Sequence, residues 1–277
     1  MNVRRKFERQ GPLWVPKYYV DPPLDRFKRY RRRFPGLANF TERQSAINFT
    51  GNASTLSASL TNNPVAGNVV CVAVTSSNGG AVLGVVVKDG ASTPNTYTNT
   101  THSPSTFLSG AGQIWLAYFI ANATANKTIT VTCTNGGGTS YGFIVEEFTV
   151  AGGGTAAYDK DATAELASGG TTAVNTPSIT PAGTGELLYA ATTVLSLVTH
   201  PTAGQAAGNW TGSAAGLIDS GLAGAEYQLN AGTAQAVNYT ASSGNTGWSG
   251  MAMAFTWTAS STPLTESLSD NADNDNW

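Results

Sequence analysis

The chain has 277 residues, only two cysteines and a formal net charge of −2. This length allows a large buried core, and so few cysteines exclude a disulfide-rich scaffold. The charges are divided unequally. Residues 1–43 carry +8, from 12 Lys and Arg against four acids, and the remaining 234 residues carry −10, from three Lys against 13 acids. The near-neutral total therefore combines a basic segment with an acidic body.

The basic segment, residues 1–43, is predicted to be an extended arm. Its prolines break any long helix, and its large aromatic side chains supply contact surface. A segment of this kind becomes ordered when it lies on a partner. The residues expected to contact that partner are Arg4, Arg5, Trp14, Tyr18, Tyr19, Arg26, Phe27, Lys28, Arg29, Tyr30, Arg31, Arg32, Arg33 and Phe34.

Residues 44–259 are predicted to form an all-β body, because short apolar runs alternate there with turn residues. Ten strands are expected, at 55–60, 68–74, 81–87, 113–120, 127–134, 141–150, 186–195, 224–229, 235–241 and 250–258. In the segment 127–134 threonines alternate with apolar residues, which places Cys133 on a buried face. Two buried thiols, Cys71 and Cys133, are favoured over one bridge.

The body also contains an internal similarity. Residues 63–74 resemble 180–192, and residues 117–132 resemble 225–240. We therefore predict one jelly-roll-like β-sandwich of two pseudo-repeated halves, about 50–150 and 170–258. Residues 260–277 are acidic and sparse in apolar residues, which predicts a flexible tail.

Motifs for catalysis or for cofactor and metal binding are weak. His102 and His200 lie in polar loops without a ligand at suitable spacing, and adjacent Glu146 and Glu147 on one strand must face opposite sides. Residues 159–165 imitate the start of a calcium loop but lack its glycine and final glutamate. The prediction is a protein without catalytic residues, metal or cofactor, and not an enzyme.

Several motifs in order resemble a β-sandwich module of phage virion structural proteins that also occurs in bacterial surface proteins. They are an Asp-Asn-Tyr turn at Asp89, Asn95 and Tyr97, aromatic-rich strands, and an Asp-Ala turn at Asp161 and Ala162. The resemblance covers roughly residues 60–257 and does not include the basic segment. It implies a non-enzymatic building or binding module on a particle or surface.

The basic segment has two main interpretations. Arginine-rich arms can neutralise a packaged genome, whereas Arg mixed with Trp, Tyr and Phe has the composition of protein interface hot spots. The large apolar side chains favour docking onto protein, and the prolines argue against a membrane surface. We therefore predict a virion structural protein, assembled in the host cytoplasm, whose arm docks onto capsid, portal or tail proteins, with a homo-oligomer expected.

Two alternatives remain open. The protein could be a shell-forming coat protein with its arm on the genome, or a carbohydrate- or receptor-binding module. For the second alternative Trp210, between glycines in a loop-like stretch, is the candidate sugar platform. The basic start of the chain runs into prolines without an apolar stretch, so no secretory signal is expected.

Overall fold

The protein is all-β, as predicted. A computed structural model describes residues 3–10, 13–20, 39–50, 53–77, 84–107, 112–134, 140–166, 171–175, 178–194, 198–199, 210–215, 223–231, 238–245 and 248–260. Their regular structure is antiparallel strand, apart from one 3-10 turn, η2 (Ala151–Gly153). Within these ranges no helix is long and apolar enough to cross a membrane. The chain divides into two compact units, Met1–Leu37 and Ala38–Trp277.

The N-terminal unit contains a β-hairpin. In it β1 (Val3–Gln10) pairs antiparallel with β2 (Leu13–Val20), and the register places Arg5 opposite Tyr18 and Arg9 opposite Trp14. The start of the basic segment is therefore paired with itself, where a single extended arm was predicted. Prolines exclude a helix but are compatible with a two-stranded ribbon, in which every strand is an edge.

In the second unit, the strands between residues 40 and 150 form two sheets. The larger has the order β3-β11-β5-β9-β7, with β8 also paired to β9, and the smaller has the order β4-β10-β6. The strands are β3 (Phe40–Thr50), β4 (Thr55–Ser59), β5 (Val69–Ser77), β6 (Val85–Asp89), β7 (Thr98–Asn99), β8 (Ser105–Phe107), β9 (Gly112–Ile120), β10 (Thr128–Cys133) and β11 (Ser140–Val150).

The strands between residues 155 and 258 form two further sheets. The larger has the order β12-β19-β14-β17-β16, and the smaller has the order β13-β18-β15. The two larger sheets share an arrangement. In the first, the edge strand β3 lies beside β11, the last strand before residue 150; in the second, the edge strand β12 lies beside β19, the last strand of the chain that is described. The strands are β12 (Thr155–Leu166), β13 (Thr171–Asn175), β14 (Glu186–Val194), β15 (Val198–Thr199), β16 (Thr211–Gly212), β17 (Ala223–Ala231), β18 (Asn238–Asn245) and β19 (Trp248–Thr258).

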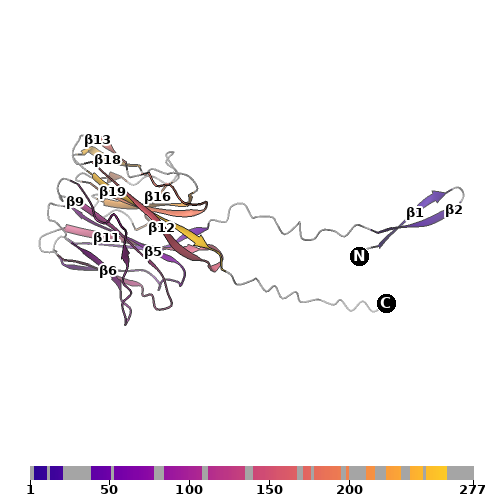
Figure 1. Cartoon of the computed structure of the whole chain (residues 1–277), viewed down its shortest axis with the longest axis horizontal. Coiled ribbons are helices and arrows are strands. Elements are labelled where there is room, and N and C mark those ends of the chain that lie inside the picture. The colour runs from indigo at the N-terminus through magenta and orange to yellow at the C-terminus, as the bar shows by residue number, and fades with distance from the viewer. Residues whose placement is uncertain are drawn as a thin grey trace. The chain divides into compact units, whose positions relative to one another are not determined.

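The sheets of the body lie in layers (Figure 1). Two hydrophobic cores hold these layers together. The first lies between the two larger sheets, where Leu116 and Phe148 face Tyr189 and Phe255. The second lies on the other face of the first larger sheet, beneath the small sheet β4-β10-β6. The small sheet β13-β18-β15 contacts β14 and β19. The body is therefore sandwich-like, with stacked sheets.

The position of a strand in these layers explains its sequence pattern. β10 has one face on a core, so buried Ile129, Val131 and Cys133 alternate with more exposed threonines. β5 is covered on both faces, so Val69 to Val74 are all buried without alternation. Consecutive residues of β5 face opposite cores, and Cys71 lies in the first core, whereas Cys133 lies in the second. Both cysteines are free and buried, which confirms the prediction of two buried thiols.

The two edge strands β3 and β12 were not predicted. Each is polar and carries a bulge that leaves one residue unpaired, Arg43 in β3 and Asp159 in β12. Charged residues and bulges are common on edge strands, because they hinder pairing with another chain. Asp161 and Ala162 lie inside β12, so the predicted Asp-Ala turn and the calcium-like loop are in fact strand.

The start of β3 also moves part of the basic segment into the body. Phe40 is fully buried in the first core, and Asn39 donates a hydrogen bond to the carbonyl oxygen of Gly185 at 3.2 Å. Gly185 has a positive φ of 81°, and a Cβ there would lie 1.8 Å from Asn39 Nδ2. Residues 39–43 therefore belong to the body, and the basic unit ends before them.

Candidate functional site

The predicted docking residues lie in the N-terminal unit. Arg4 and Arg5 are in β1, and Trp14, Tyr18 and Tyr19 are in β2. The register pairs Arg4 with Tyr19 and Arg5 with Tyr18, so basic and aromatic positions adjoin across the hairpin. The most basic stretch, residues 26–34, lies outside the described residues.

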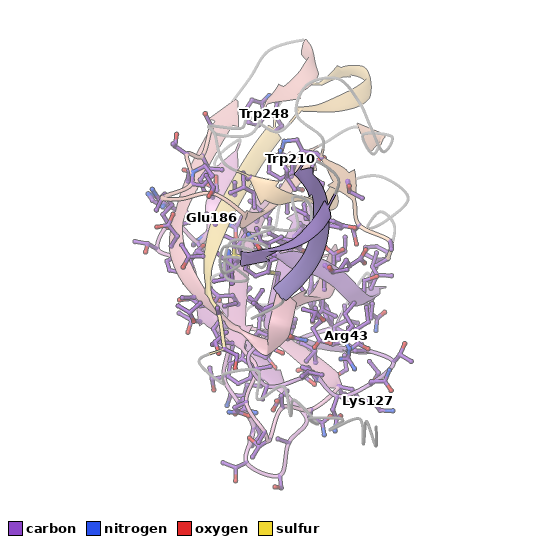
Figure 2. The ribbon with its side chains drawn as sticks, turned by 90° about the vertical axis from the view of Figure 1, so that its right-hand side faces the viewer. Arg43, Lys127, Glu186, Trp210 and Trp248 are labelled. Carbon is purple, nitrogen blue, oxygen red and sulfur yellow. The ribbon has the colours of Figure 1, made fainter. Side chains whose placement is uncertain are left out.

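Trp210 is not the exposed sugar platform that was predicted. Its exposed fraction is 4%, and its Nε1 has no hydrogen-bond partner among the described residues. Trp210 and Trp248 lie near one end of the body, away from Arg43 and Lys127 (Figure 2). A loop-like sequence between glycines predicted exposure, but this tryptophan is a core residue.

Glu147 is a fully buried carboxylate with a complete set of donors. Its Oε2 accepts hydrogen bonds from Arg43 Nη1 at 2.6 Å and from Gln44 Nε2, and its Oε1 accepts from Asn68 Nδ2 and from the backbone N–H of Val65. The bulge at Arg43 brings this guanidinium to Glu147. The network joins β3 and β11 to the segment that precedes β5. Its role is structural, because it connects the edge strand to the interior of the sheet.

Glu146 faces the other side of β11, as predicted for adjacent strand residues. Burial raises the pKa of Glu146 to about 8; the hydroxyls of Ser213 and Tyr189 act to lower this pKa and the negative charge of Glu42 acts to raise it. Glu42 accepts a hydrogen bond from the Tyr227 hydroxyl at 2.7 Å. Glu146 therefore lies among polar groups from both larger sheets.

His102 has a carboxylate partner that sequence spacing did not reveal. Its Nδ1 lies 2.9 Å from Asp161 Oδ2, and its backbone N–H donates to the same oxygen at 2.9 Å. The Tyr158 hydroxyl donates to Asp161 Oδ1 at 2.6 Å, and the Tyr158 ring stacks on Tyr118 with centroids 4.6 Å apart. Burial acts to raise the pKa of Asp161, but the hydrogen bonds from Tyr158 and His102 lower it overall. The pair joins the loop after β7 to β12, and 59 residues separate its members in the chain.

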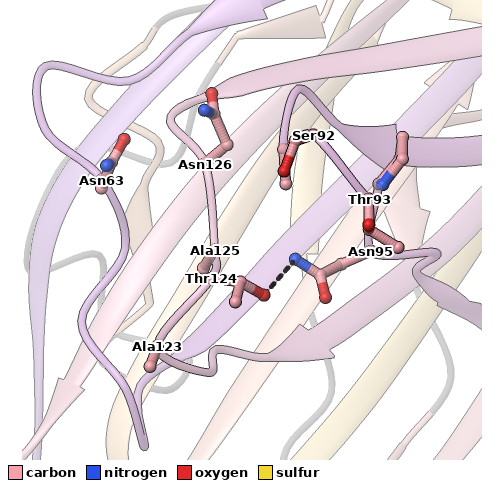
Figure 3. Close-up of a pocket in the computed structure, with 10 residues that line it drawn as sticks. Asn63, Ser92, Thr93, Asn95, Ala123, Thr124, Ala125 and Asn126 are labelled. Atoms are coloured by element: carbon pink, nitrogen blue, oxygen red, sulfur yellow. Dashed lines mark hydrogen bonds between the residues drawn. The ribbon is translucent and has the colours of Figure 1, made fainter.

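A polar groove lies beside the small sheet β4-β10-β6 (Figure 3). Its cavity volume is about 530 Å³, and it is lined by Asn63, Ala91, Ser92, Thr93, Pro94, Asn95, Ala123, Thr124, Ala125 and Asn126. Asp89 and Asn95 form the turn expected from the resemblance, since Asp89 accepts hydrogen bonds from the backbone N–H and the side chain of Asn95. The remaining lining residues come from loops whose sequences gave no specific prediction.

No group of three or more His, Cys, Asp or Glu side chains that could hold a metal ion occurs among the described residues. Comparisons with protein-family models, with curated proteins and with solved structures find no match to this chain.

Proposed function

We propose that this chain is a non-enzymatic structural protein of a phage virion, which docks through its N-terminal unit onto capsid, portal or tail proteins. The observation that carries the docking is the separate two-stranded hairpin β1–β2. An isolated hairpin of two strands is marginally stable at best in water. Contact with a partner surface would supply the missing stabilisation, and the basic and aromatic residues of the unit suit a protein interface.

The buried acids of the body support a partner outside this body. Five of its described carboxylate residues have exposed fractions of 3% or less, namely Asp89, Glu146, Glu147, Glu186 and Glu226. Burial therefore shields five of the 13 acids counted for the body, which reduces the negative charge that its surface offers to the basic unit. The proposed docking surface is an acidic surface of another subunit that also has room for aromatic side chains.

The virion setting and the role as a decoration, cement or fibre-base protein rest on the resemblance of residues 60–257. We also propose that the body is a jelly-roll-like sandwich of two pseudo-repeated halves. The shared order of strands in the two larger sheets supports this repeat. Two copies of one unit fused back to back would produce the observed stack of sheets.

The test compares the full-length protein with a variant that lacks residues 1–37. This boundary keeps Phe40 and Arg43, which belong to the body. Each protein is sedimented alone, with empty capsid shells, and with duplex DNA at low and moderate salt. We expect co-sedimentation with shells that requires residues 1–37, and no spontaneous shell formation.

Two full-length variants separate charge from contact surface. One replaces the six Lys and Arg of residues 26–34 with Gln, and the other replaces Phe27, Tyr30 and Phe34 with Ser. Docking onto protein should be weakened by both. Spontaneous shells, or DNA binding that depends on the six basic residues alone and collapses with salt, would contradict the proposal and favour a coat protein with a genome-binding arm.

A further inference from the structure

The groove beside the small sheet β4-β10-β6 is large enough for a small ligand. Its volume of about 530 Å³ lies within the usual range of ligand sites, roughly 300–1,000 Å³. Three loops form its walls: the turn after β4, the turn after β6 and the loop between β9 and β10 (Figure 3). None of its lining residues takes part in the docking proposed above.

The loops are held in place by one buried carboxylate beneath the groove. Asp89 has an exposed fraction of 3%. It accepts hydrogen bonds from the backbone N–H groups of Ala91, Asn95 and Asn126, and from Asn95 Nδ2 at 2.7 Å. Since Asp89 bonds to two of the three loops, their positions are fixed before any ligand arrives. Preorganisation of this kind lowers the entropy cost of binding.

Two asparagine side chains offer unpaired donors at the groove. Asn63 Oδ1 accepts from the backbone N–H of Lys127, and Asn126 Oδ1 accepts from the backbone N–H of Thr128, each at 3.0 Å. These bonds fix the orientation of both amides. Neither Nδ2 group has a hydrogen-bond partner among the residues that the structure describes, so both remain available to a ligand.

Further hydrogen-bonding groups lie on the other wall. Asn95 is linked to Asn122 and Thr124 by hydrogen bonds, which leaves its amide fixed. The hydroxyls of Ser92 and Thr93 make no hydrogen bond within the described part of the chain. The groove thus combines two fixed amide donors with hydroxyls that can donate or accept.

The chemistry of this lining selects the class of ligand. The ten described lining residues include no charged side chain, which disfavours an anion or a metal ion, and Asp89 has its oxygens occupied by N–H donors. Neutral donors and acceptors at fixed positions suit a ligand that carries many hydroxyl groups. We propose that this groove binds a neutral saccharide. No aromatic ring lines the groove to stack on a sugar, so the expected dissociation constant is about millimolar.

The test is an NMR titration of the full-length protein with neutral trisaccharides of glucose, galactose, mannose and N-acetylglucosamine. At least one should shift the backbone amide signals of residues 91–95 and 122–126. Asn126→Asp keeps the anchored oxygen and removes the free donor, so we expect it to weaken binding by about tenfold or more. Thr93→Lys, at an exposed position, should weaken binding by obstructing the groove.

Asn62→Asp is the matched control, because Asn62 is exposed, adjacent to Asn63 and not part of the lining. It should bind like the unchanged protein. The proposal is wrong if no trisaccharide shifts these signals at about 50 mM, well above a millimolar dissociation constant. It is also wrong if the shifts fall elsewhere or if Asn62→Asp loses affinity equally. None of these outcomes depends on docking by the N-terminal unit.

Discussion

The two larger sheets each bury a glutamate completely, and they surround it with opposite environments. In the first sheet, Glu147 accepts hydrogen bonds from four groups, one of them the guanidinium of Arg43. In the second sheet, the carboxyl oxygens of Glu226 have no hydrogen-bond partner among the described residues. Burial accordingly raises the pKa of Glu226 to about 9.

The difference shows that burial alone does not determine what a carboxyl group does in this fold. Glu147 is surrounded only by donors, which suit the ionised form. Glu226 lacks such donors, so the protein keeps it protonated at neutral pH and avoids the cost of a bare buried charge. The same residue type therefore stabilises one sheet through its charge and weakens the other as the pH rises.

The largest expected loss of stability is that of Glu147→Gln. This change places an amide NH2 group against groups that are all donors, and it leaves Arg43 without its carboxylate. We expect a loss of about 3 kcal/mol in the free energy of unfolding, measured by urea denaturation at neutral pH. A loss near zero would mean that the donors around Glu147 rearrange easily, and the comparison between the two sheets would fail.

The same change, glutamate to glutamine, should increase the free energy of unfolding at high pH when it is made at Glu226. The folded-state pKa lies above the ordinary value of 4.5, so folding keeps a proton that the unfolded chain releases. Stability should fall as the pH rises from about 4.5 to about 9, by up to about 1.4 kcal/mol per pH unit. Glu226→Gln removes this contribution, so it should stabilise the protein at about pH 8 and matter little at about pH 5.

The free energy of unfolding should still depend on pH in the Glu226→Gln variant. Glu146 keeps its own raised pKa of about 8 and contributes a slope of the same sign. Unfolding curves of both proteins across this range would measure the two contributions. If the free energy of unfolding falls with pH equally steeply in the variant and in the unchanged protein, Glu226 is ionised in the folded state.

The smallest expected effect concerns Asp161, at the contact between the first set of strands and β12. Its pKa is lowered, so its contribution is present above the ordinary 3.8 and is lost as the pH falls through the lowered value. Asp161→Asn should cost about 1 kcal/mol at neutral pH, with a smaller difference in acid. The neighbouring Asp159→Asn is the control. An equal loss for both variants at every pH would argue against a specific role for the His102–Asp161 pair.

The sequence predicted the strands whose composition reflects the core. All ten predicted segments overlap observed strands, because runs such as 68–74 and 250–258 are buried and rich in apolar residues. It missed β3 and β12, whose polar residues reflect their positions at sheet edges. An edge is a property of the assembled sheet, so no local pattern in residues 155–166 distinguishes this strand from a loop.

The sites were harder to predict for the same reason. His102 and Asp161, or Arg43 and Glu147, become neighbours only through pairing of distant strands. Trp210 was expected to be exposed because its flanking residues are typical of a loop, but a large aromatic ring in a loop can still fill a core. The turn at Asp89 and Asn95, which are six residues apart, was expected only from the resemblance to the phage module.

Because of where the two cysteines lie, the fold does not depend on whether its surroundings are reducing or oxidising. Cys71 and Cys133 lie in different cores, on opposite sides of the first larger sheet, whereas a disulfide requires Cβ atoms about 4 Å apart. Burial raises the pKa of the Cys71 thiol well above its usual range and that of Cys133 to about 11, so little reactive thiolate forms at neutral pH. The native protein can thus move from a reducing compartment to an oxidising one without forming or losing a covalent link.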